Sequence, residues 1–134
     1  MIKQGVGGMM VAHLSIPALD DTPIKPGKTT TMPTTLSKKV VTDLLKNEMQ
    51  YKGLIFTDAL NMKGASGISP KYGIDVAAFL VGNDILLIPN NVSTAIKKMK
   101  RAFKAKKFSE ERLALSVKKI LKAKYLVGFE QNHS

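Results

Sequence analysis

Residues 54–62 read LIFTDALNM, and this stretch decides how the rest of the chain is interpreted. The apolar run Leu54–Phe56 follows Gly53 and ends abruptly at the polar pair Thr57 and Asp58. Reactive side chains in parallel α/β folds lie at the carboxyl ends of the strands, so Asp58 stands where a catalytic carboxylate is expected. An aspartate at a strand end also commonly caps a helix or stabilises a turn, and spacing alone favours that second role.

Two more strands are predicted, one on each side of this stretch. The first covers residues 8–14 and is continuously apolar over residues 9–12, which is typical of a strand buried on both faces. The second covers residues 84–88 and is closed by Pro89. Helical patterns lie between and after these strands. Strands that alternate with helices are parallel and joined by right-handed crossovers, so the predicted fold class is α/β.

Four helices are predicted from apolar periodicity and from the residues that end them. Ser37 and Ser109 are placed to cap the first and the last helix, and Gly82 is placed to end the second. Residues 15–36 hold four prolines and a threonine run, which is typical of a long functional or mobile loop. The expected helices cover residues 37–50, 74–81, 93–105 and 109–126.

Length and composition limit the class of protein. At 134 residues and 14.6 kDa the chain is one domain, well short of the roughly 250 residues of a complete (β/α)₈ barrel. No apolar run reaches the roughly 18 residues needed to cross a bilayer, so no membrane span is expected. The first residues lack the apolar core of a signal peptide, and bacterial cytoplasm and cell envelope both stay open as compartments. The absence of cysteine excludes disulfides and thiolate metal sites.

The net charge of +11 raises the question of nucleic-acid binding. Most cations fall between Lys97 and Lys124, where they alternate with apolar residues as in amphipathic helices with solvated lysine faces. Lysine outnumbers arginine, aromatic residues make up only 6% of the chain, and no nucleic-acid-binding motif occurs. We therefore expect no specific nucleic-acid partner, only a loose attraction to anionic polymers.

Five segments carry a family pattern in a fixed order. They are residues 7–22, 33–37, 53–62, 82–89 and 122–128. At these spacings they closely resemble the latter part of glycoside hydrolase family 3, in its β-N-acetylglucosaminidase branch. The resemblance extends from about Gly5 to Phe129, which is nearly the whole chain.

The resemblance implies a specific architecture. The parallel strand-helix units would form the last three βα units of a TIM barrel, strands six to eight with their helices. Residues 1–134 would then be a single partial TIM-barrel domain. An incomplete barrel leaves two open sheet edges and an apolar face uncovered. We therefore expect a homo-oligomer, or contact with the missing half of the barrel.

The resemblance also assigns a role to Asp58, which matches the nucleophile of the family motif Ser/Thr-Asp-(Asp/Ala)-Leu-x-Met. Such a carboxylate attacks the anomeric carbon and forms a covalent glycosyl intermediate, which water then hydrolyses with retention. The implied reaction releases terminal β-linked N-acetylglucosamine, as from peptidoglycan-derived muropeptides or chitin oligomers. It needs no cofactor, and no metal-ligand spacing occurs in the sequence.

Three further residues are candidates for substrate binding. Met10 aligns with the methionine of the family's Val-Met-x-Ala-His stretch, which approaches the sugar, but a core methionine in a buried strand is an equal alternative. His13 ends the first strand and either contacts substrate or only orients a loop. Met62 either shapes the pocket floor or packs beneath it. His133 lies in a polar tail and is expected to be inert.

One family feature does not occur in this chain. Family members carry a Lys-His-Phe-Pro-Gly-His-Gly run and then Asp-Ser-His ahead of this region, and these supply the general acid/base. The only histidines here are His13 and His133. The chain therefore carries the nucleophile region without the acid/base loop, and we expect it to be inactive alone. A non-catalytic remnant, a sugar-binding module and a basic module for anionic polymers remain alternatives.

Overall fold

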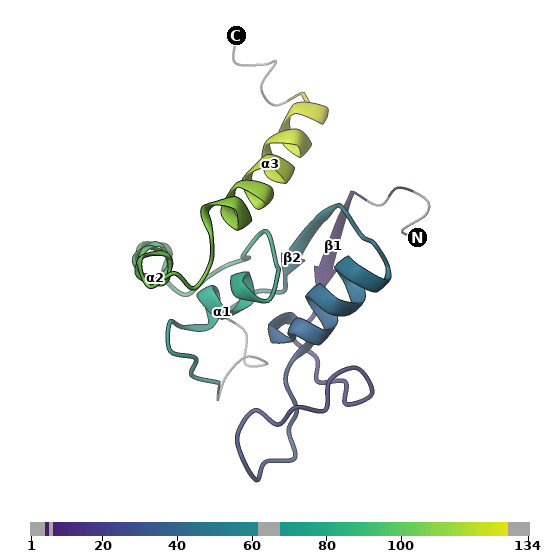
Figure 1. Ribbon diagram of the computed structural model, residues 1–134, viewed down its shortest axis with the longest axis vertical. Coiled ribbons are helices and arrows are strands. Elements are labelled where there is room, and N and C mark those ends of the chain that lie inside the picture. Colours follow the sequence, from purple (N-terminus) through teal and green to yellow (C-terminus); the bar gives the residue numbers. More distant parts are fainter. Residues whose placement is uncertain (1–4, 6, 62–67, 129–134) are drawn as a thin grey trace.

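The computed structural model describes residues 5, 7–61 and 68–128 of the chain, which form an α/β structure (Figure 1). Two parallel strands, β1 (Gly8–Val11) and β2 (Leu54–Thr57), are paired from Gly8↔Leu54 to Val11↔Thr57. The predicted parallel pairing is therefore confirmed. The helical elements are the 3₁₀ turn η2 (Thr34–Leu36), the π-helix η3 (Lys39–Glu48), α1 (Ile74–Leu80), α2 (Val92–Lys104) and α3 (Glu110–Leu126).

The helix positions follow the local signals in the sequence to within two residues. The Ser109 hydroxyl accepts a hydrogen bond of 3.0 Å from the Arg112 amide, as a capping serine should. Ser37 accepts one of 3.2 Å from the Val40 amide at the start of η3. Gly82 follows α1 with a φ of 122°, a conformation that residues with a side chain rarely adopt.

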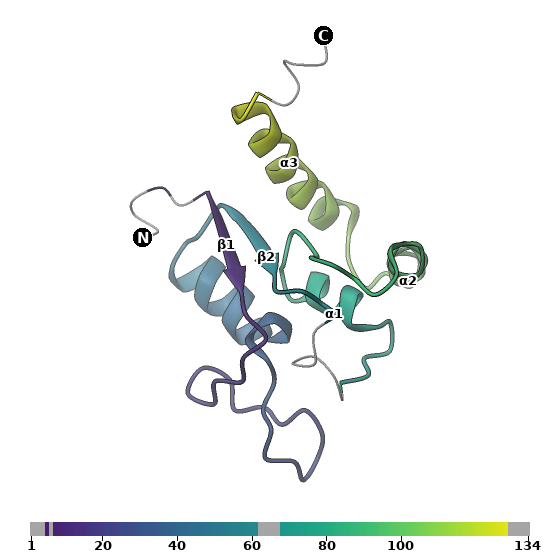
Figure 2. The same ribbon diagram turned by 180° about the vertical axis from the view of Figure 1, so that it is seen from behind.

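The main core lies between the sheet and η3, which covers one face of β1 and β2. Five buried side chains fill it: Val11, Val41, Leu45, Tyr51 and Ile55. The view from behind shows β1 in front of this helix, with no helix over the opposite face of the strand (Figure 2). A second cluster of Leu36, Leu60 and Ala78 joins η2 to α1.

The first strand is shorter and less buried than expected. It ends at Val11 rather than at residue 14, and Met10 is 59% exposed. Side chains alternate between the faces of a strand, so Gly8 and Met10 point away from the face that carries Val11 and η3. The prediction of burial on both faces was wrong because only one face of β1 is covered.

The third predicted strand, residues 84–88, is also not formed. Within the described part of the chain this segment makes one parallel bridge, Phe56↔Ile85. The ladder stops because the Leu87 amide bonds to the Thr57 hydroxyl, at 2.9 Å, instead of continuing along the backbone. Ile88 then adopts a φ of 41°, which no extended strand allows.

The long loop of residues 15–36 carries two isolated antiparallel bridges, Ser15↔Pro33 and Pro23↔Thr31. Its buried Asp20 accepts a hydrogen bond of 2.6 Å from the Ser37 hydroxyl, which fastens the loop to the start of η3. Among the residues described, no helix is both long and apolar enough to span a bilayer.

Candidate active site

The carboxyl ends of β1 and β2 form one rim. Val11 pairs with Thr57 at the last position of the ladder, and the Asp58 amide donates a bond of 3.0 Å to the Val11 carbonyl. His13 and Asp58 follow directly after these two strand ends. This parallel register agrees with the expectation that His13 and Asp58 lie on the same rim.

His13 is buried at this rim and bonds through both ring nitrogens. Its Nε2 donates to the Ala59 carbonyl oxygen at 3.0 Å, and because a carbonyl only accepts, the proton must lie on Nε2. Its Nδ1 lies 3.0 Å from the Thr35 hydroxyl. His13 therefore joins the end of β1 to η2 and to the backbone immediately after Asp58.

Asp58 itself is half-buried. Its Oδ1 accepts a bond of 2.8 Å from the amide of Ala59, the next residue. This is a contact between the aspartate and the backbone of its own chain neighbour. The same carboxylate stands at the carboxyl end of a parallel strand, where α/β folds carry reactive side chains.

The other candidate residues have different outcomes. Met10 is the register partner of Phe56 on the uncovered face of the sheet, so the alternative of a core methionine is wrong. Met62 and His133 lie outside the described residues. Asn61, which precedes Met62 in the chain, is exposed.

Sequence reasoning missed the threonines that hold the rim. The Thr34 hydroxyl donates to the Ala12 carbonyl at 2.6 Å, and the Thr35 hydroxyl lies 2.7 Å from the same oxygen. Thr57 is fully buried and accepts from Leu87. The available signal was the pair Thr34 and Thr35 directly after Pro33, where apolar residues would be expected if the segment only filled the core.

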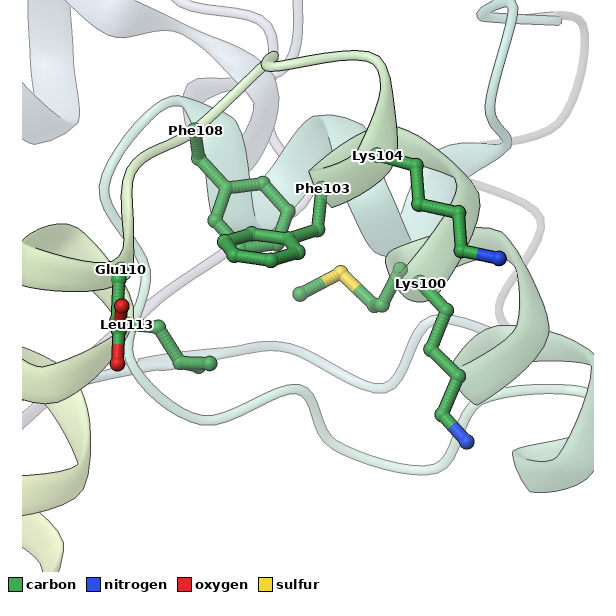
Figure 3. A pocket seen from close by; sticks show the side chains of 7 residues that line it. Lys100, Phe103, Lys104, Phe108, Glu110 and Leu113 are labelled. Atoms are coloured by element: carbon green, nitrogen blue, oxygen red, sulfur yellow. The ribbon is translucent and has the colours of Figure 1, made fainter.

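Two further features were considered as sites. Residues 5, 7–61 and 68–128 contain no group of three or more histidine, cysteine, aspartate or glutamate side chains placed to hold a metal ion. An apolar pocket of about 480 Å³ lies between α2 and α3, lined by Phe103, Phe108 and Leu113 among others and by neither His13 nor Asp58. Figure 3 shows the rings of Phe103 and Phe108 lying against each other. The ammonium groups of Lys100 and Lys104, which also line this pocket, extend away from the rings.

Fold and rim together define a parallel α/β protein with a carboxylate at the carboxyl end of β2. The chain belongs to glycoside hydrolase family 3. Residues 1–123 match the model of the glycosyl hydrolase family 3 N terminal domain, which is almost the entire sequence.

Individual relatives agree with this assignment. Beta-hexosaminidase A of Pseudoalteromonas piscicida is 32% identical over 136 aligned residues, which cover 92% of this chain and 23% of the relative. The structure of a family 3 beta-N-acetylglucosaminidase from Paenibacillus sp. str. FPU-7 superposes with a TM-score of 0.75 at 33% identity, over 92% of this chain and 23% of that one. Beta-glucoside phosphorylase BglX bound to 2FGlc superposes with a TM-score of 0.84 at 25% identity, over 99% and 24%. The chain thus spans about a quarter of the length of these proteins.

Proposed function

We propose that this chain carries the nucleophile region of a retaining β-N-acetylhexosaminidase that releases terminal β-linked N-acetylglucosamine. The observation that carries the proposal is the position of Asp58, directly after β2 and next to the end of β1. The hexosaminidase names of the relatives support the substrate class. Asp58 would attack the anomeric carbon, and the resulting glycosyl ester would be hydrolysed by water.

His13 is proposed to position the nucleophile. Its bond to the Ala59 carbonyl fixes the peptide between Ala59 and Leu60, one residue beyond Asp58, and Thr35 contacts the other side of the ring. With both nitrogens occupied within the chain, orientation of the loop is the better supported of the two roles predicted for His13. Met10, exposed on the open face, is free of core packing and is proposed to contact the sugar. Met62 enters the proposal by resemblance alone.

The chain is further proposed to supply strands six to eight of a TIM barrel, with residues 84–88 as a third strand that forms only when the sheet is completed. Among the described residues β1 pairs with β2 alone, which leaves its other edge without a partner. A second copy, or the remainder of a barrel, would cover this edge and the exposed Met10. Of these two partners, only the remainder of a barrel would also bring a general acid/base to Asp58.

On this proposal the chain alone turns over unactivated N-acetylglucosaminides negligibly, because general acid help is worth about 10²–10⁴-fold. An aryl glycoside with a good leaving group is the most sensitive probe. Robust hydrolysis of an unactivated N-acetylglucosaminide that Asp58→Asn abolishes and His13→Ala spares would show that the chain brings its own proton donor.

A chimera tests the function itself. The barrel of the Paenibacillus enzyme, with its corresponding segment replaced by residues 5–128 of this chain, should hydrolyse 4-nitrophenyl N-acetyl-β-glucosaminide. Asp58→Asn should lower kcat by several orders of magnitude, whereas the exposed-residue control Asp21→Asn should not. A folded chimera with equal activity in both variants would refute the assignment.

A further inference from the structure

A basic pocket lies at the end of the sheet opposite to the rim. It has a volume of about 270 Å³ and lies between the end of η3, the segment that leads into β2, and α3. Tyr51 and Lys52 line it just before β2 begins, and Asp84 lines it where its carboxylate accepts from the Ile55 amide. The pocket is therefore at the amino ends of the strands, away from Asp58 at their carboxyl ends.

Four cationic side chains line this pocket against a single carboxylate: Lys46, Lys52, Arg112 and Lys119 face Asp84. The carboxylate is already fully engaged. It accepts from the Lys119 ammonium at 3.1 Å and from the Ser116 hydroxyl at 2.5 Å, in addition to the Ile55 amide at 3.0 Å. The four cations therefore exceed the single negative charge of Asp84, which attracts Lys46 without an ion-pair contact.

Lys46 is the unusual member of this set. It is partly buried, and within the described part of the chain its ammonium group has neither a hydrogen-bond acceptor nor an ion-pair partner. Burial lowers its pKa from 10.5 to about 8, and the nearby charges of Arg112 and Lys119 contribute to the same shift. Such a group is destabilised by its surroundings unless an anion joins it.

Gly82 makes room for this ammonium group. A Cβ at that position would lie 3.0 Å from the Lys46 Nζ and 2.9 Å from the Thr42 hydroxyl. Arg112 is held in place by the backbone, since its guanidinium donates to the carbonyl oxygens of Phe79 at 3.1 Å and Asn83 at 2.9 Å. Three of the cations, Lys46, Arg112 and Lys119, are thus partly buried along this pocket, and Lys52 lies exposed at it.

We propose that this basic pocket binds a small phosphate anion, either orthophosphate or a small phosphate monoester, with Lys46 and Lys52 as its direct ligands. A phosphate dianion compensates more of the excess charge than a single carboxylate does, and lysine binds phosphate as a compact point charge. The volume excludes a polymer chain. Since the amino-terminal face of a barrel serves stability rather than catalysis, the anion would stabilise the fold and leave the chemistry at Asp58 unchanged.

The test uses the full chain with ¹³C-dimethylated lysines. Orthophosphate or glycerol phosphate is added stepwise, and sodium chloride keeps the ionic strength constant. The expected result is a higher pKa of Lys46 and a higher Tm when phosphate is added. A larger response to glycerol phosphate than to orthophosphate would identify the monoester as the ligand. Lys46→Met and Lys52→Met should each weaken the response at least about tenfold, because a charge-assisted hydrogen bond is lost.

Lys28→Met is the matched control, since it removes one exposed lysine charge from the loop of residues 15–36. It should leave the phosphate response unchanged. Lys46→Met removes a desolvated charge and should itself fold, which circular dichroism checks. An equal phosphate response in Lys28→Met and Lys46→Met, or no response in the unaltered chain, would overturn the proposal.

Discussion

His13 and Ala59 are joined by a hydrogen bond of 3.0 Å from the imidazole Nε2 to the carbonyl oxygen, across 46 positions of the sequence. Ala59 also donates its amide to the carboxylate of Asp58, at 2.8 Å. One residue, Ala59, thus links the buried histidine near the end of β1 to the carboxylate at the end of β2. The rim is held by side chains that reach the backbone, so its geometry depends on residues distant in sequence.

Removal of this link should loosen the rim. His13→Ala removes the bonds to Ala59 and Thr35 and leaves the Ala59 carbonyl without its partner, so we expect a loss of about 1–3 kcal/mol in the free energy of unfolding. Urea denaturation of His13→Ala and of the unaltered chain measures this loss in the free energy of unfolding. The amide of Ala59 should also exchange faster with solvent.

Thr35→Val provides a second measurement of the same network, because it removes the hydroxyl and keeps the shape. Thr29→Val, at an exposed position of the preceding loop, is its control. Equal stability of the two valine variants would show that the Thr35 hydroxyl does not hold His13 in place.

The pH dependence of stability should report Asp20. Burial alone would raise the pKa of this carboxyl, but hydrogen bonds led by that from Ser37 outweigh burial and lower the pKa from 3.8 to about 2. A lowered pKa in the folded state means that the stabilisation is complete above about pH 4 and is lost as the pH falls towards 2. Asp20→Asn should therefore reduce the acid sensitivity of unfolding, measured between about pH 5 and about pH 3.

Asp43→Asn is the control for that measurement, because Asp43 pairs only with the exposed Lys38 among the described residues. If both asparagine variants lose stability with acid in parallel with the unaltered chain, Asp20 is not the group responsible.

Lys46 should give a pH dependence of the same sign, but at alkaline pH. Its pKa is about 8 in the folded state and 10.5 in the unfolded reference, so between these values the unfolded chain binds more protons. Stability then rises with pH over this window, and Lys46→Met should remove the rise. The difference in unfolding free energy between Lys46→Met and the unaltered chain should be larger at about pH 7.5 than at about pH 9.5, and an equal difference at both would contradict the shifted pKa.

The open face of β1 predicts self-association. Met10 is 59% exposed and the edge of β1 has no partner among the described residues. Light scattering should show a mass that grows with concentration in the micromolar range, and Met10→Lys should reduce that growth because a charge disfavours edge pairing. A compact monomer that persists at these concentrations would count against the partial-barrel proposal.

The elements that the sequence predicted well are those with local signals. Strand β2 is found at Leu54–Thr57 as expected, and Ser109 caps α3, because an apolar run or a capping hydroxyl acts within a few residues. Residues 84–88 failed as a strand because their pairing depends on the hydroxyl of Thr57, about thirty positions away.

The site was predictable only in part. Asp58 could be found because a strand end and a family motif coincide there. The contacts of His13 with Thr35 and Ala59 span 22 and 46 positions and leave no periodic trace in the sequence. The basic pocket around Lys46 was hidden for the same reason, since its four cations come from η3, the segment before β2 and α3, and each resembles an ordinary surface lysine or arginine.

The central claim is that Asp58 is the nucleophile of a retaining hexosaminidase. The most direct measurement is the mass of the peptide containing Asp58 after the chimera has reacted with a fluorinated N-acetylglucosaminyl substrate that forms the glycosyl ester quickly and hydrolyses it slowly. The account predicts one added sugar on the Asp58 carboxylate, absent in Asp58→Asn. An active chimera whose label lies on another residue, or that forms no covalent intermediate, would contradict it.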